Sequence, residues 1–304
     1  MDKLALKEEF LRFMKPEAVL MDEPMKKHTS FKIGGPADLL LMPTSIEEIK
    51  RIIDICNIRK APYFVMGNGS NLLVTDRGIR KVAIKIADNF NAVNIVGTKI
   101  IAQAGLLLST LSNKALKESL SGLEFASGIP GTLGGAVAMN AGAYGGEMKN
   151  VITSCKVLDR EGKIKILPID EMEMGYRTSM VQTQHLIVLE VEMLLEKKDY
   201  SIIKDKVDEL NMQRTTKQPL HLPSAGSVFK RPEGNYAGKL IQDCNLKGYR
   251  IGGAQVSELH SGFIVNVGNA SAEDVINLIK HIQTEVKSKF NIQLQTEVKI
   301  MGEN

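Results

Sequence analysis

The stretch from Gly128 to Gly145, GIPGTLGGAVAMNAGAYG, constrains the fold more than any other part of the chain, because glycine and alanine dominate it. Side chains this small over a whole segment let a bulky neighbour approach the backbone closely. A helix beginning near Thr132 would direct free N–H groups and the positive end of its dipole at that neighbour, which favours an anion. Tight helix packing inside a core is the alternative. Glycine at both turns and both helix ends exceeds what core packing needs, so we interpret the stretch as a ligand loop.

A second glycine-rich turn, Gly67-Asn68-Gly69-Ser70-Asn71, follows a short apolar run. Its small residues let successive N–H groups converge on one point, as in a phosphate-binding loop, although a plain hairpin turn has the same composition. It is not a Rossmann fingerprint, because Leu72-Leu73-Val74 favours a strand where a helix would begin, and it lacks the Lys of a Walker loop. Together the two loops indicate a diphosphate-bearing cofactor held without a Rossmann turn.

Apolar periodicity predicts the remaining elements of a chain that, at 304 residues, is long enough for two or three compact units. Helices are expected at the N-terminus, after a possible capping box Ser45-x-x-Glu48, and over 106–120, 201–212, 236–245 and 271–289. A turn-rich stretch beginning near residue 213 predicts a domain boundary. Strands are expected on either side of a Gly-Gly-Pro turn within 28–42, at 63–66, 72–74, 80–86, 93–103 with a hairpin at Gly97-Thr98, 151–158, 162–167, 185–195, 227–229, 260–267 and 292–300.

Composition excludes several classes of protein. Hydrophobic residues make up 43% and charged residues 24%, as in a soluble globular protein. The net charge of +4 is spread without a basic block, so we expect no nucleic-acid partner, whereas anionic small molecules remain suitable ligands. Three distant cysteines predict neither disulfides nor a metal site. With no signal-peptide pattern and no run of about 18–20 apolar residues, we expect a cytoplasmic protein without a membrane anchor.

Three residues carry candidate chemistry. Arg177, in Tyr-Arg-Thr-Ser, could hold a carboxylate through two charge-assisted hydrogen bonds, unless it is an ordinary surface residue. Ser227 follows a glycine but lacks the Gly-x-Ser-x-Gly elbow and an evident histidine base, so we expect it to donate a proton or cap a group rather than attack. Glu297 interrupts the expected last strand, which indicates either a sheet edge or a carboxylate that enters a site.

In this order, the motifs resemble those of the UDP-N-acetylenolpyruvoylglucosamine reductase (MurB) family. Each piece is weakly specific, but seven in register are highly specific. The resemblance implies an α+β protein with a two-subdomain FAD-binding fold of the vanillyl-alcohol-oxidase (PCMH) type and a small α+β substrate-binding domain. The matching motifs are HTSFKIGGPAD, GNGSNLLV, GIPGTLGGAVAMNAGAYG, GYRTSM, PSAGSVFKRP, LKGYRIGGAQVSELHSGFIVN and LQTEVKIMG.

The resemblance also implies a domain division. Between Glu190 and Lys217 there is no room for the tyrosine-bearing loop of the family's longer branch, so the chain is similar to the shorter branch. The expected parts are an N-terminal helix (1–20), FAD-binding subdomains 1 and 2 (21–88 and 89–212), the substrate-binding domain (213–290) and a C-terminal strand carrying Glu297 (291–304).

By the same resemblance, NADPH reduces non-covalently bound FAD, which then delivers hydride to C3 of UDP-N-acetylglucosamine enolpyruvate and yields UDP-N-acetylmuramate for peptidoglycan synthesis. Ser227 would protonate C2, Arg177 would stabilise the developing charge by roughly 3–4 kcal/mol, and Glu297 would orient or stabilise the serine and the substrate. A monomer is expected. Substrate contacts are assigned to Lys217, Arg231 and His260, and FAD contacts to Gly67, Asn68, Gly69, Ser70, Asn71, Leu72, Gly128, Pro130, Gly131, Thr132, Gly134, Gly135, Asn140, Gly142 and Ala143.

Two alternatives stay open at this point. A flavin-dependent oxidase of the same fold is disfavoured because no His or Cys motif is placed for covalent flavin attachment. A non-catalytic nucleotide-binding protein is disfavoured because Arg177, Ser227 and Glu297 are all present.

Overall fold

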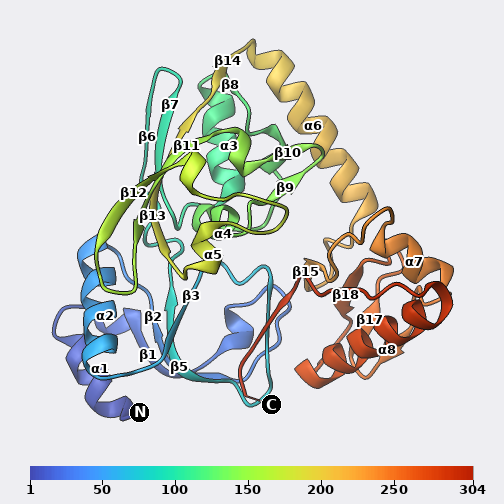
Figure 1. Ribbon diagram of the computed structural model, residues 1–304, viewed down its shortest axis with the longest axis horizontal. Helices are drawn as coiled ribbons and strands as arrows, with labels where there is room; N and C mark the ends of the chain where they lie inside the picture. The colour runs from blue at the N-terminus through green and yellow to red at the C-terminus, as the bar shows by residue number, and fades with distance from the viewer. Residues whose placement is uncertain (304) are drawn as a thin grey trace. The chain divides into compact units, whose positions relative to one another are not determined.

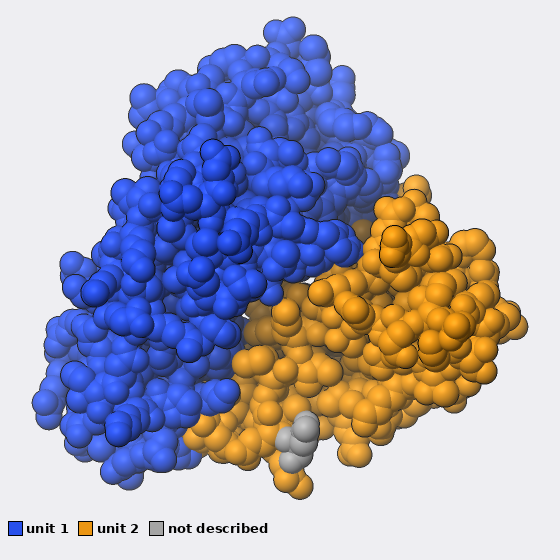
Figure 2. Space-filling view, in the orientation of Figure 1, with its two compact units in different colours: residues 1–21, 39–68, 81–214 blue, residues 22–38, 69–80, 215–304 orange. Residues whose placement is uncertain are grey.

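The computed structural model describes residues 1–303, which form two compact units (Figures 1 and 2). Unit 1 comprises residues 1–21, 39–68 and 81–214, and unit 2 comprises residues 22–38, 69–80 and those from Thr215 onward. Each unit has a hydrophobic core of its own. The two units do not follow the five ranges expected from the sequence, because 22–38 and 69–80 pack with the C-terminal part; those five ranges stay a prediction.

Four strands form a sheet in the order β1-β2-β5-β3, with β3 parallel to β5. The chain passes between the units within three of these strands, β1, β2 and β5. The strands are β1 (Val19–Pro24), β2 (Pro36–Leu41), β3 (Tyr63–Met66) and β5 (Ile79–Lys85).

Unit 1 is built around an antiparallel sheet with the strand order β12-β11-β13-β7-β6. The β6–β7 hairpin turns at Gly97, whose φ of 63° confirms the predicted turn. The strands are β6 (Val93–Val96), β7 (Lys99–Gln103), β8 (Leu120–Ser121), β9 (Gly142–Ala143), β10 (Gly146–Glu147), β11 (Ile152–Leu158), β12 (Ile164–Pro168), β13 (Ile187–Leu194) and β14 (Glu196–Lys197). The helices are α1 (Lys3–Leu11), α2 (Ile46–Ile58), α3 (Leu108–Lys117), α4 (Leu133–Ala138), α5 (Met180–Thr183) and α6 (Tyr200–Lys217), whose end passes into unit 2.

Helix α2 shows how the sequence pattern sets its burial. Ile49, Ile52, Ile53 and Cys56 recur on one face and are buried, as their spacing predicts. Ser45 Oγ caps the helix by accepting the Glu48 N–H at 3.1 Å, but the Glu48 carboxylate accepts from Thr44 rather than from Ser45. The predicted capping box is therefore half formed.

Unit 2 carries an antiparallel sheet in the order β15-β18-β17-β16 and a parallel pair of β4 and β19. Among residues 1–303, no helix of either unit is both long and apolar enough to span a membrane. The elements are β4 (Leu72–Val74), β15 (Ser224–Ser227), α7 (Ala237–Asp243), β16 (Arg250–Ile251), β17 (Ala254–Val256), β18 (Phe263–Asn266), α8 (Ala272–Phe290) and β19 (Lys299–Met301).

Several predicted boundaries were wrong. Strand β2 begins at Pro36, which the sequence had placed in a turn; a first strand residue can lack the N–H donor. Strand β15 ends at Ser227 instead of beginning there. The last strand is only Lys299–Met301, so Glu297 precedes it. Helix α6 continues to Lys217, because no helix-breaking residue occurs before Pro219.

The N-terminus of α8 is held by three acidic or hydroxyl side chains. Ser271 and Asp274 form a capping box, and the Asp274 carboxylate also accepts the Gly253 N–H at 3.0 Å. The Asp76 carboxylate accepts the N–H groups of Ala272 and Glu273 at 2.9 and 3.1 Å. The hydrogen bonds from Gly253 and Ser271 lower the pKa of Asp274 despite its partial desolvation.

Replacing Asp274 by asparagine tests this cap. At pH 7 the variant should lose about 1 kcal/mol of unfolding free energy, because a neutral amide oxygen accepts these bonds less strongly than a carboxylate. Because folding lowers the pKa of Asp274, its contribution is present above the unfolded pKa of about 3.9 and is lost as the pH falls through the folded pKa. Urea unfolding at neutral pH and at about pH 2.5 measures the change.

Glu273→Gln is the matched control, since it removes a carboxylate from the same helical turn without removing the capping box. Because Glu273 is exposed, the substitution should cost only about 0.3 kcal/mol through the helix dipole. A penalty for Asp274→Asn that is equal at both pH values would contradict the assignment.

Candidate functional site

The glycine stretch contains the helix that the sequence predicts. Helix α4 begins at Leu133, with Thr132 as its N-cap. The Leu133 and Gly134 N–H groups, however, donate to the carbonyls of Leu106 and Ala104, both at 2.8 Å. Two donors that the sequence assigned to an anion are thus bonded within the protein, and this part of the ligand interpretation was wrong.

The glycines of this stretch lie against different neighbouring residues. A Cβ at Gly128 would lie 2.7 Å from Cδ and Nε of Arg214, and one at Gly134 would lie 2.9 Å from the Ala104 Cβ. At Gly135, the nearest atom to such a Cβ is Thr132 Oγ1, at 3.5 Å. Internal packing therefore explains Gly128 and Gly134, whereas Gly135 faces open space.

That space is a cavity of about 110 Å³ within unit 1. None of its lining side chains is charged, so it suits a flat apolar ring better than a diphosphate. The lining residues are Val65, Met66, Gly67, Ile86, Ala104, Thr132, Gly134, Gly135, Ala138, Val181, Leu186, Ile187 and Val188.

The turn after β3 has tight backbone packing. Gly69 has a φ of 66°, and a Cβ there would lie 2.1 Å from the His28 carbonyl oxygen, so only glycine fits. Leu72 opens strand β4, as predicted. The Asn71 amide donates to the Glu297 carbonyl at 3.1 Å, so this predicted cofactor residue supports the backbone of a predicted catalytic residue.

Arg177 occupies a strained turn of unit 1, closed by the Gly175–Thr178 bridge. Its φ of 56° is unfavourable for a side chain with a Cβ and costs about 1–2 kcal/mol. Its guanidinium lies 5.3 Å from the Tyr176 ring centroid, with Nη1 3.5 Å from the Gly142 carbonyl oxygen. This backbone conformation sets the direction in which the side chain leaves the turn, and the bridge maintains it.

Asn140 links this turn to the glycine stretch. Its buried amide donates to the Gly175 carbonyl at 3.1 Å and to the Glu147 carboxylate at 2.6 Å, and its Oδ1 accepts the Lys149 N–H. The resemblance assigned Asn140 to the cofactor. Sequence reasoning missed this supporting role for the Arg177 turn.

Ser227 and Glu297 lie on neighbouring segments of unit 2. The Glu297 N–H donates to the Val228 carbonyl at 2.7 Å, next to a bridge between Phe229 and Thr296. Ser227 Oγ donates to the Phe229 carbonyl at 3.2 Å. The structure therefore brings together these two predicted catalytic residues, which are seventy positions apart in the chain, while Arg177 belongs to unit 1.

The predicted substrate residues differ in their surroundings. Lys217 is the exposed last residue of α6, and the exposed Arg231 guanidinium lies 4.0 Å from the Tyr236 ring centroid. His260 is half-buried beside Ser227: a Cβ at Gly262 would lie 3.0 Å from His260 Cε1 and 3.4 Å from Ser227 Oγ. Sequence reasoning missed Gly262, although its place directly after His260-Ser261 could have drawn attention to it.

Arg214 is a second feature that sequence reasoning missed. It packs against Gly128 in unit 1, and its guanidinium lies 6.0 Å from the Tyr144 ring centroid. Burial lowers the pKa of Arg214, while Tyr144 acts in the opposite direction. The sequence feature that could have indicated this contact is Gly128, because a residue without a side chain leaves space for the arginine.

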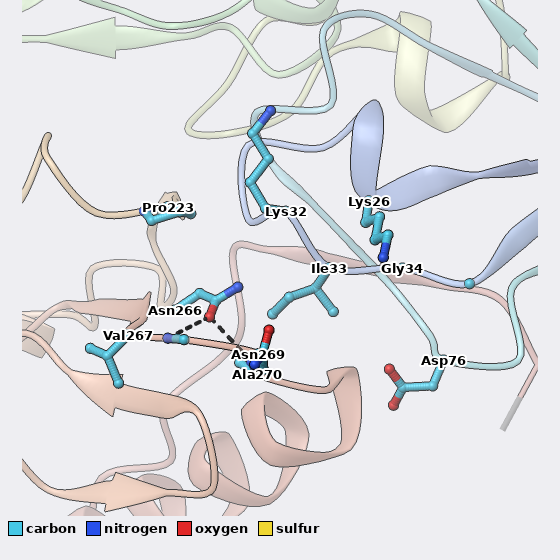
Figure 3. A pocket seen from close by; sticks show the side chains of 12 residues that line it. Lys26, Lys32, Ile33, Gly34, Asp76, Pro223, Asn266, Val267, Asn269 and Ala270 are labelled. Atoms are coloured by element: carbon cyan, nitrogen blue, oxygen red, sulfur yellow. Dashed lines mark hydrogen bonds between the residues drawn. The ribbon is translucent and has the colours of Figure 1, made fainter.

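A second depression, of about 630 Å³, lies within unit 2 and contains none of the predicted site residues (Figure 3). Asn266 Oδ1 accepts the N–H groups of Gly268 and Ala270 there. The Asp76 carboxylate at its edge is already engaged with α8. Asn266 thus stabilises the loop after β18, and Asp76 stabilises the start of α8.

Comparisons with known proteins agree with this architecture. The "FAD binding domain" family matches residues 37–167, and "UDP-N-acetylenolpyruvoylglucosamine reductase, C-terminal domain" matches residues 218–301. A solved UDP-N-acetylenolpyruvylglucosamine reductase from Thermus caldophilus is 35% identical, with a TM-score of 0.81 over 93% of this chain and 99% of that one. The predicted α+β fold, with an FAD-binding fold followed by a substrate-binding domain, is confirmed.

Curated relatives extend over the whole length. Proteins named UDP-N-acetylenolpyruvoylglucosamine reductase from Alkaliphilus metalliredigens and Alkaliphilus oremlandii are 62% and 57% identical, covering 100% of this chain and 100% of each relative. A relative from Clostridium botulinum with the same name is 55% identical over 94% of this chain and 93% of its own length. Identity this high over the full length of both chains, together with the two family matches, confirms the resemblance: this chain belongs to the UDP-N-acetylenolpyruvoylglucosamine reductase family.

Proposed function

We propose that this chain reduces UDP-N-acetylglucosamine enolpyruvate to UDP-N-acetylmuramate, with FAD as bound cofactor and NADPH as electron donor, in peptidoglycan precursor synthesis. The observation that carries the proposal is the full-length identity of 62% with a reductase of that name. We further propose that it acts as a cytoplasmic monomer. NADPH oxidation that does not depend on the enolpyruvyl nucleotide sugar would contradict the proposed reaction.

We assign part of a ring system of FAD to the apolar cavity of unit 1. Gly67 and Gly135 bring the backbone to the cavity wall without a side chain, and the uncharged lining suits a flat heteroaromatic group. When bound, FAD reduced by NADPH supplies the hydride for C3 of the substrate. The FAD assignments for the other residues of the two loops remain predictions.

Ser227 would give its hydroxyl proton to C2. In this structure the hydroxyl donates to the Phe229 carbonyl, so it must turn away from that oxygen before it can serve the substrate. Glu297 is anchored on both sides, through its N–H to Val228 and its carbonyl to Asn71, which fixes the backbone from which its carboxylate extends. Such anchoring supports a role in orienting the serine or the enolate.

Positive charges would meet the anionic parts of the substrate. Arg177 would stabilise the charge that develops at C2 and its carboxylate, from a turn that the Gly175–Thr178 bridge closes. Lys217, Arg231 and His260 would contact the nucleotide sugar, whose diphosphate favours cationic partners.

Gly135→Val tests the cavity. The added side chain would enter the space intended for the ring, so we expect flavin affinity to fall about 10–100-fold, with the fold intact. Flavin absorbance of the purified protein and titration of the apoprotein with FAD measure the effect. By contrast, Gly134→Ala should lower thermal stability, because its methyl group would lie 2.9 Å from the Ala104 Cβ. Unchanged flavin binding by Gly135→Val would show that the ring binds elsewhere.

Ser227→Ala tests the proton donor. We expect flavin reduction by NADPH to be nearly unchanged and oxidation of the reduced enzyme by substrate to slow by about 10²–10⁴-fold, because only the second half-reaction needs the proton. Stopped-flow absorbance separates the two half-reactions. Ser224→Ala, at the start of the same strand, is the control and should alter neither. Equal damage to both half-reactions would show that the role given to Ser227 is wrong.

A further inference from the structure

The turn from His260 to Gly262 is anchored against the end of β15. The Val228 N–H donates to the Gly262 carbonyl at 2.9 Å, and the Phe263 N–H donates to the His260 carbonyl at 2.9 Å. Ser257 Oγ accepts the His260 N–H at 3.2 Å. These bonds hold the turn at a fixed position beside Ser227.

Two glycines make room for the imidazole of His260. A Cβ at Gly262 would lie 3.0 Å from His260 Cε1 and 3.2 Å from Nδ1, tighter than ordinary contacts, and one at Gly238 would lie 3.4 Å from Cε1. The hypothetical Gly262 Cβ would also lie 3.4 Å from Ser227 Oγ. The imidazole and the serine hydroxyl are therefore neighbours across a residue that has no side chain.

Hydrogen bonding defines the tautomer of His260. Its Nδ1 accepts the Gly262 N–H at 3.1 Å, so the proton of the neutral ring lies on Nε2. Burial lowers the pKa of His260, which favours this neutral form near pH 7. The Phe263 ring packs edge-on at a centroid distance of 4.9 Å and limits rotation of the imidazole.

The adjacent Ser261 has an unmet hydrogen-bonding need. Its side-chain oxygen is buried, the residue is only 6% exposed, and no partner for it occurs among residues 1–303. A buried hydroxyl normally bonds to protein or to ordered water. The turn therefore holds one buried hydroxyl without a hydrogen-bond partner among these residues, directly after His260 in the chain.

We propose that His260 is a positioning residue for Ser227: its Nε2–H donates to Ser227 Oγ once the hydroxyl has turned away from Phe229, and so directs the serine proton toward C2. The proton leaves Ser227 Oγ for the carbanionic C2, His260 keeps its own proton, and the serine oxygen regains one from water. The inference rests on the proposed function but adds a role distinct from contact with the nucleotide sugar.

Two substitutions of His260 distinguish the roles of its two ring nitrogens. Glutamine can place an N–H donor where Nε2 lies, whereas asparagine can place an acceptor where Nδ1 lies. We expect His260→Gln to retain most of the rate at which saturating substrate oxidises the reduced enzyme, and His260→Asn to lose about 100-fold of that rate, both measured at substrate concentrations that saturate each variant. Circular dichroism and thermal melting establish that both variants fold.

His281, on α8, is the control position, because its ring stacks on Tyr249 at a centroid distance of 4.4 Å. The same two substitutions there should leave the rate unchanged. Nitrogen-15 NMR of the wild-type imidazole gives a second readout, independent of activity, and should show the His260 proton on Nε2.

Three results would overturn the inference: activity retained by asparagine but lost with glutamine, a change confined to the half-maximal substrate concentration, or a proton found on Nδ1. The position of the proton is measured on the wild-type protein, so that result decides the question even if neither variant folds. A wild-type enzyme that binds flavin but never reduces the nucleotide sugar would instead refute the proposed function, and the NMR result would still decide the tautomer.

Discussion

The hydrogen bond from the Glu297 N–H to the Val228 carbonyl, 2.7 Å long, is the contact on which the pairing of the two segments with predicted catalytic residues in unit 2 depends. It holds the C-terminal segment against the residue that follows Ser227. Next to it, the Lys230 N–H donates to the Gln295 carbonyl, and β19 continues as the parallel partner of β4. Ser227 and Glu297, which are distant in the sequence, are thus held by one small network of backbone hydrogen bonds.

The sequence pattern predicted those elements that depend mainly on interactions between residues close together in the chain. The apolar face and serine cap of α2, the glycine hairpin at 97 and the long helix α8 all follow from periodicity and capping within a few residues. The sequence could not show that Gly134 packs on Ala104 while its neighbour Gly135 faces a cavity, because identical residues differ only in what the tertiary fold places beside them. For the same reason, the sequence could identify Ser227 and Glu297 as candidate residues, but only the structure shows that they lie close together.

Backbone strain in unit 1 gathers around the predicted electrostatic residue. Asn140, Tyr144 and Arg177 all have left-handed φ angles, between 42° and 56°. The Asn140 amide bonds to the Gly175 carbonyl, and Arg177 contacts the Gly142 carbonyl. The conformations of Asn140 and Arg177 are therefore supported by contacts with each other's segments, as is typical of strained backbone in a folded protein.

The cap that Asp76 provides for α8 spans 196 positions of sequence. The family match at residues 218–301 includes the helix and β19 but excludes both the aspartate and β4. A fragment cut at those limits would expose two backbone amides at the start of α8 and the unpaired edge of β19. The compact unit also includes residues 22–38 and 69–80, so the domain recognisable in sequence is smaller than the structural unit to which it belongs.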